Sequence, residues 1–178
     1  FDGDTAREIG RIDLDKVVSK PHMVVFDPDR RFAYVANMGS ANASAIDAAE
    51  RKLLATVATA QDAHAAIATP DGSRAFVANV ASERLVEIVI AAAKRQFAAG
   101  RTLMLAGHPK LADATKFGNR RPICHAYTAD GAHAYVTLGG GGLLIFDTGT
   151  LEIVKTFDRT EFGANGCGLA LAADGRKM

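Results

Sequence analysis

Short apolar runs separated by turn residues dominate the first third of the chain. Residues 23–27 form an apolar run, residues 32–37 alternate between large and small side chains, and two further apolar runs cover residues 43–47 and 53–57. β-Branched and aromatic side chains, with turn signals at intervals of about eight to twelve residues, favour strands over helices. The pattern therefore predicts a unit of four short strands over residues 21–62.

The same pattern returns twice more along the chain. Its second strands read Phe-Ala-Tyr-Val-Ala-Asn at 32–37, Ala-Phe-Val-Ala-Asn at 75–79 and Ala-Tyr-Val-Thr-Leu at 134–138. Each follows an Asp-centred turn, and the turns are Pro28-Asp29-Arg30, Pro70-Asp71-Gly72, Asp130-Gly131 and, near the end, Asp174-Gly175. Gly suits such hairpins because it accepts a positive φ, so Arg30 predicts either another turn type or backbone strain. Four-stranded units repeating at this period indicate the blades of a β-propeller.

The repeats are unequally spaced. From Asp to Asp the spacings are 42, 59 and 44 residues, so the middle repeat carries about 15 residues more than its neighbours. We place this insertion at about residues 100–121.

The second strands also carry a family resemblance. Tyr34-Val35-Ala36-Asn37, Phe76-Val77-Ala78-Asn79 and Tyr135-Val136-Thr137-Leu138, each after its Asp turn, resemble the YVTN β-propeller repeat. The resemblance implies an all-β fold of four-stranded antiparallel blades, belonging to a ring of about seven blades. It also implies export to the periplasm or the cell surface. It leaves the function open, because propellers carry many unrelated activities.

The repeat register divides the chain into blades. Because Phe1-Asp2 aligns with Phe146-Asp147, we expect a partial chain of about three complete blades and two part-blades. The predicted divisions are the end of a preceding blade at 1–20, complete blades at 21–62, 63–121 and 122–165, and the start of the next blade at 166–178.

Composition narrows the classes of partner. Lys and Arg number 21 against 20 Asp and Glu among 178 residues, and no basic block indicates nucleic-acid binding. No apolar stretch is long enough to cross a bilayer. The glycines at 139–142 lack a following Lys-Ser/Thr and open no helix, so no nucleotide is expected. Two cysteines do not define the redox compartment.

Histidine placement supplies a candidate metal site. His22 and His64 occupy the same repeat position, six residues before a Pro, where the innermost strand of a blade begins. His125 lies two residues past that position in its own blade, and His108 lies in the insertion. Inner strands surround the axis of a propeller, so these four side chains are candidate ligands for Cu, Zn or Fe, or for a haem. The alternative is that each histidine only hydrogen-bonds a neighbouring blade, since no short-range metal motif occurs.

The insertion is locally basic. Arg101, Lys110, Arg120 and Arg121 are candidate contacts for an anionic ligand or an acidic partner surface. A solvated loop is the alternative, although long loops on rigid scaffolds often carry function.

Three functions follow from these observations. The first is a scaffold that binds a ligand or a protein partner through the loops at one face of the ring. The second is a metal- or haem-dependent redox or electron-transfer subunit with histidines at the axial channel. The third is a lactonase-like hydrolase. Whether the chain is an enzyme is left open by the sequence.

Overall fold

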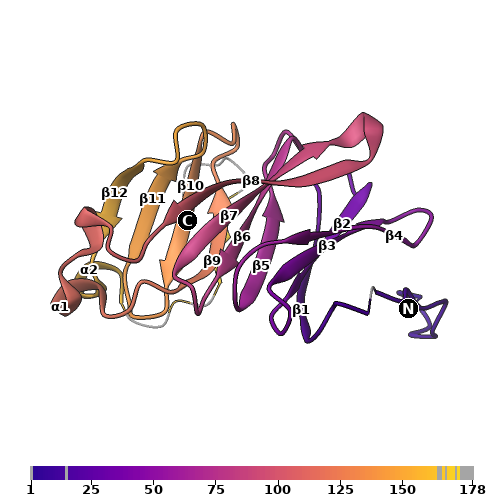
Figure 1. The fold of residues 1–178 in the computed structure, drawn as a ribbon, viewed down its shortest axis with the longest axis horizontal. Helices are drawn as coiled ribbons and strands as arrows, with labels where there is room; N and C mark the ends of the chain where they lie inside the picture. The colour runs from indigo at the N-terminus through magenta and orange to yellow at the C-terminus, as the bar shows by residue number, and fades with distance from the viewer. Residues whose placement is uncertain (1, 15, 164–165, 167, 171, 173–178) are drawn as a thin grey trace.

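Three four-stranded antiparallel sheets make up most of the chain and stand side by side (Figure 1). The computed structural model describes residues 2–14, 16–163, 166, 168–170 and 172. In each sheet the strands lie in chain order, as in a propeller blade, and the three sheets do not close into a ring. The predicted all-β fold of four-stranded blades is thus confirmed.

The strands are assigned to three blades as follows. Blade 1 contains β1 (Pro21–Phe26), β2 (Phe32–Asn37), β3 (Asn42–Asp47) and β4 (Lys52–Ala58). Blade 2 contains β5 (Ala63–Ala68), β6 (Arg74–Asn79), β7 (Arg84–Ala91) and β8 (Gln96–Met104). Blade 3 contains β9 (Pro122–Tyr127), β10 (His133–Leu138), β11 (Leu143–Asp147) and β12 (Ile153–Phe157).

The helices are short. They are η1 (Ala92–Lys94), η2 (Pro109–Leu111), α1 (Ala114–Phe117) and α2 (Arg159–Phe162). None of the helices in the described residues is long and apolar enough to cross a membrane.

The asparagine that ends the repeated strand has a structural role. In blade 1 the Asn37 amide donates to Asn42 Oδ1 over 2.8 Å and to Ser44 Oγ over 3.0 Å, which ties β2 to β3. In blade 2 the Asn79 amide donates to the Ala60 carbonyl over 2.7 Å, in the connection between blades. Both asparagines are buried, so these bonds replace lost contacts with water.

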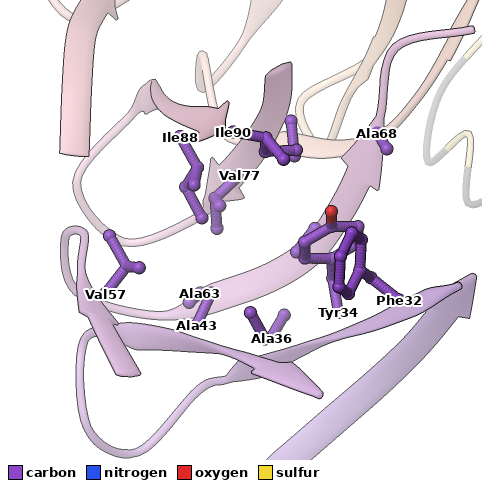
Figure 2. Packing of buried hydrophobic residues seen from close by; sticks show 13 residues of the cluster. Phe32, Tyr34, Ala36, Ala43, Val57, Ala63, Ala68, Val77, Ile88 and Ile90 are labelled. Atoms are coloured by element: carbon purple, nitrogen blue, oxygen red, sulfur yellow. The ribbon is translucent and has the colours of Figure 1, made fainter. Parts of the chain in front are cut away.

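The main core lies between blades. Phe32 and Tyr34 of β2 point across the first interface toward small residues of blade 2, among them Ala68 (Figure 2). Phe97 of β8 meets the Phe32 ring edge to face, with centroids 5.3 Å apart. Blade 2 supplies alanines where blade 1 supplies aromatic rings, so the two sheets can approach closely. These small residues are Ala63, Ala66, Ala68 and Ala75.

The second interface uses larger side chains on both blades. The Phe76 ring of β6 packs against the Phe146 ring of β11, with centroids 5.2 Å apart. The Tyr127 hydroxyl of β9 donates to the Ile67 carbonyl over 2.7 Å and links the inner strands directly. Blades 2 and 3 therefore share one continuous core of buried residues.

The insertion begins later than the sequence predicts. Residues 100–104 belong to the outer strand β8, so the inserted connection covers residues 105–121. It has 17 residues, where the connection between blades 1 and 2 has four (59–62). The rest of the extra length lies in the β7–β8 hairpin. The pattern hides β8 because most of its side chains are exposed and small or polar.

The first residues pack on blade 1 without forming a strand. Within the described residues 2–14 and 16–20 no helix or strand is present, and Ile12 and Leu14 contact the apolar face of blade 1 that carries Val35 and Ile46. The predicted turn at Asp174-Gly175 lies outside the described residues.

The hairpin at Arg30 adopts the same conformation as its glycine-containing copies. Arg30 has φ 56°, close to the 66° of Gly72 and the 70° of Gly131. The three turns therefore share one backbone conformation, which is strained at Arg30 because this residue has a Cβ. Asp27 Oδ1 stabilises the turn by accepting the Phe32 N–H over 2.9 Å. Of the two alternatives raised by the sequence, the structure shows backbone strain.

We expect Arg30→Gly to stabilise the protein. Relief of the left-handed strain outweighs the extra entropy of an unfolded Gly, so the free energy of unfolding should rise by about 0.5–1 kcal/mol. Gly72→Ala is the matched control, because a Cβ there meets no atom within 4 Å and only the backbone conformation opposes it. Thermal unfolding should show a higher Tm for the first variant and a lower Tm for the second. A lower Tm for Arg30→Gly would contradict the assigned turn.

Candidate functional site

The candidate site lies where the inner strands begin. The connections between blades and the loops between second and third strands meet at this end, which we call the axial face. Backbone bonds join them in all three blades: Met38 N–H to the Lys20 carbonyl, Val80 N–H to Asp62 and Gly139 N–H to Arg121. The inserted residues 105–121 therefore lie on the same face as the starts of β1, β5 and β9.

His22 and His64 each occupy a β-bulge. The pairing of β1 with β2 shifts between Pro21 and Met23, and the pairing of β5 with β6 shifts between Ala63 and Ala65. The residue inside each bulge has no cross-strand partner, and a bulge redirects its side chain away from the regular alternation. Both blades thus present an imidazole at the same point of the axial face.

Packing of blade 1 on blade 2 brings these two imidazoles together. Their ring centroids are 4.2 Å apart with planes tilted by 40°. His22 Nδ1 lies 3.2 Å from the His64 carbonyl oxygen. A carbonyl only accepts, so in the neutral His22 ring Nδ1 carries the proton and Nε2 has the lone pair.

His64 is held neutral at pH 7. Partial burial is the main cause that lowers its pKa, and the neighbouring His22 lowers it further. The backbone of Ile123 and the carboxylate of Asp62 act in the opposite direction. Asp62 was not among the candidate site residues predicted from the sequence, although its position two residues before His64 places a carboxylate near that imidazole.

The other two candidate ligands lie apart from this pair. His125 is 2% exposed in the interface between blades 2 and 3, where its ring meets Tyr127 at 5.5 Å between centroids. His108 accepts the Lys110 N–H at Nδ1 over 3.2 Å and so begins η2. Among the described residues no group of three or more His, Cys, Asp or Glu side chains is arranged to hold a metal ion. The structure therefore brings together two of the four histidines.

Three of the four basic candidates are committed to the fold. Arg101 Nη2 and Nε bind the two oxygens of buried Glu87 over 2.7 and 2.9 Å, a contact that lowers the Glu87 pKa. The Lys110 ammonium donates to the Ile153 carbonyl. Arg120 Nε donates to the Leu111 carbonyl over 2.8 Å. These side chains hold the insertion and the neighbouring blade in place.

Arg121 differs from the other basic candidates. Its side chain is exposed at the axial face, and its guanidinium makes no hydrogen bond or ion pair with the described residues. It is therefore the one member of the predicted basic set, within the described structure, whose charge is available to a ligand.

The insertion is a packed cap over blade 3. Leu105, Leu111 and Phe117 are buried in the core shared by blades 2 and 3. A Cβ added to Gly140 would lie 2.2 Å from Asn119 N, so the cap approaches the β10–β11 loop too closely for any larger residue. The apolar residues within this basic segment were the sequence signal for packing.

Burial of His125 makes the stability of the fold pH-dependent. Desolvation lowers its pKa from 6.5 to about 4, and the backbone groups of Ile67 and Phe76 oppose this shift without cancelling it. Neither ring nitrogen has a hydrogen-bond partner among the described residues. The folded ring thus stays neutral where the unfolded ring takes up a proton.

We expect titration of His125 to leave the free energy of unfolding unchanged above pH 6.5 and to lower it as the pH falls from 6.5 toward 4. The loss from this one group reaches about 3 kcal/mol in free energy of unfolding. His125→Leu removes the titrating group and keeps the volume, so urea unfolding at several pH values should show a flatter pH profile. His133→Leu, at a half-buried position on the opposite face, should leave the profile steep. Equal profiles for wild type and His125→Leu would contradict the burial of a neutral ring.

Comparison with known proteins identifies the fold only. The sequence matches no protein-family model and no curated protein. The structure is similar to hydrazine synthase of Kuenenia stuttgartiensis, with 20% identity, a TM-score of 0.68, and coverage of 84% of this chain and 39% of that one. It is also similar to a protein of unknown function from Desulfotomaculum acetoxidans, with 17% identity, a TM-score of 0.64, and coverage of 84% and 45%.

A third similar structure is a Bacteroides fragilis protein provisionally assigned as a 6-phosphogluconolactonase. It has 19% identity, a TM-score of 0.65, and coverage of 82% of this chain and 41% of its own length. The chain thus spans about two fifths of the length of these structures. Together with its three four-stranded blades, this similarity shows a propeller-like fold.

Proposed function

We propose that this chain is a segment of a YVTN-type β-propeller that binds a ligand or partner at the axial face. The repeated second strands and the structural role of Asn37 and Asn79 support the family. A periplasmic or extracellular location is proposed from the same resemblance. Binding is preferred to a redox or hydrolytic role because it requires only the scaffold and its loops.

The observation that carries this proposal is the exposed guanidinium of Arg121, which has no partner among the described residues. The other basic candidates neutralise Glu87 or bind backbone carbonyls, whereas the Arg121 guanidinium faces solvent. The Arg121 backbone is fixed to the β10–β11 loop, since Gly139 N–H donates to the Arg121 carbonyl over 2.8 Å. A fixed backbone with an uncommitted guanidinium suits recognition of a carboxylate or a phosphate.

The carboxylates of the Asp turns at the opposite face are engaged within the fold. There Asp71 accepts from the Thr69 hydroxyl over 2.5 Å, and Asp130 accepts from the Thr128 hydroxyl over 2.6 Å. Asp147 likewise accepts the backbone N–H groups of Gly149 and Thr150. The polar side chains of these turns satisfy their own backbone, as expected for Asx turns.

An anion titration tests the proposal. We use 6-phosphogluconate as the probe, since it carries both a phosphate and a carboxylate and relates to the name of one structural neighbour. In amide NMR spectra we expect shifts concentrated at the axial face around Arg121. Arg121→Glu should abolish them without changing the Tm, because this side chain makes no hydrogen bond or ion pair with the residues that the structure describes.

Lys52→Glu is the charge-matched control, at an exposed position where β4 begins. It should leave the shifts unchanged. Shifts that survive Arg121→Glu, or that are lost equally in Lys52→Glu, would show that general charge rather than the axial face attracts the anion.

A further inference from the structure

We propose that His22 and His64 together form a two-ligand site for a divalent transition-metal ion on the axial face. This inference rests on the proposed binding role of that face and names a second class of ligand for it. It narrows the four candidate histidines to the two whose rings adjoin.

The geometry suits a shared ion. Zinc–imidazole bonds are about 2.0–2.1 Å long, so two nitrogens on one ion lie about 3 Å apart. The two ring centroids are 4.2 Å apart, so the rings are direct neighbours, and both turn to direct one nitrogen each toward a shared ion. His22 is exposed, so its ring can turn while Nδ1 keeps its contact with the His64 carbonyl.

The His64 carbonyl orients the His22 ring for metal binding. A metal-bound imidazole usually donates its other N–H to a carbonyl or carboxylate, which fixes the tautomer and the ring orientation. His22 already has this partner in the His64 carbonyl, 3.2 Å from its Nδ1. Its Nε2 is then the metal-binding atom.

His64 is also suited to bind the metal ion. The bulge at the start of β5 directs its ring toward the axial face, where it lies against the ring of His22. The Asp62 carboxylate acts on the charge of His64 and so favours a cation at this position. Neutral imidazoles select zinc, nickel or copper rather than calcium or magnesium, and water completes the coordination.

The remaining histidines lack these features. His125 is enclosed by the second blade interface, and His108 uses Nδ1 to begin η2. His133 lies at the start of β10, on the opposite face. These positions supply matched controls within the same chain.

Zinc titration of the EDTA-treated protein tests the site. Calorimetry at neutral pH should give one Zn²⁺ per chain. The histidine ring nitrogen resonances of His22 and His64 should shift, while those of His108, His125 and His133 stay in place. His22→Ala should weaken binding by about 10-fold or more, the scale on which metal sites respond to loss of a supporting group.

The His22→Ala variant is expected to fold, because His22 is exposed and its substitution opens no cavity. An unchanged Tm without metal checks this. His108→Ala and His133→Ala should bind Zn²⁺ as the wild type does.

Two results would overturn the site: no Zn²⁺ binding by wild type, or wild-type affinity in His22→Ala. The proposed anion binding is tested separately, because Arg121→Glu should abolish the 6-phosphogluconate shifts while the zinc site remains. Failure of either titration therefore does not decide the other.

Discussion

The packing of one blade against the next is the constraint on which the rest of the structure depends. At the first interface Phe32 and Tyr34 fill the space that alanines leave on blade 2, and at the second Phe76 packs on Phe146. Burying such a ring contributes about 2–3 kcal/mol, against about 1 kcal/mol for a hydrogen bond such as that of the Tyr127 hydroxyl. Apolar packing therefore supplies most of the stability, and hydrogen bonds between blades, such as those of the Tyr127 hydroxyl and of Arg101 with the Gly149 carbonyl, fix the position of each blade.

The candidate site is a consequence of this packing. Neither imidazole of the pair is placed by its own blade alone, because a bulge at the start of β1 or β5 only directs a side chain toward the axial face. Contact between the rings arises when the two sheets meet. The cap formed by residues 105–121 is fixed in the same way, through Leu111 and Phe117 in the core between blades 2 and 3.

The sequence predicted the parts that depend on local pattern. Alternation placed β2 at 32–37 and the Asp turns placed the hairpins, since both follow from strand geometry and turn chemistry. It did not predict the contacts that a side chain makes with a neighbouring strand or blade. Arg101 reads as an available cation until Glu87 is seen beside it, and His125 reads as an axial ligand until blade 2 covers it. The extent of β8 was missed because an exposed outer strand has no apolar alternation.

The central claim is that blade packing holds His22 and His64 in contact at the axial face. Nuclear Overhauser spectra of the metal-free protein at neutral pH test it most directly, because they report proximity between protons of different strands. The account predicts cross-peaks between the ring protons of His22 and those of His64. Resolved, assigned ring resonances with no cross-peak between them would contradict it.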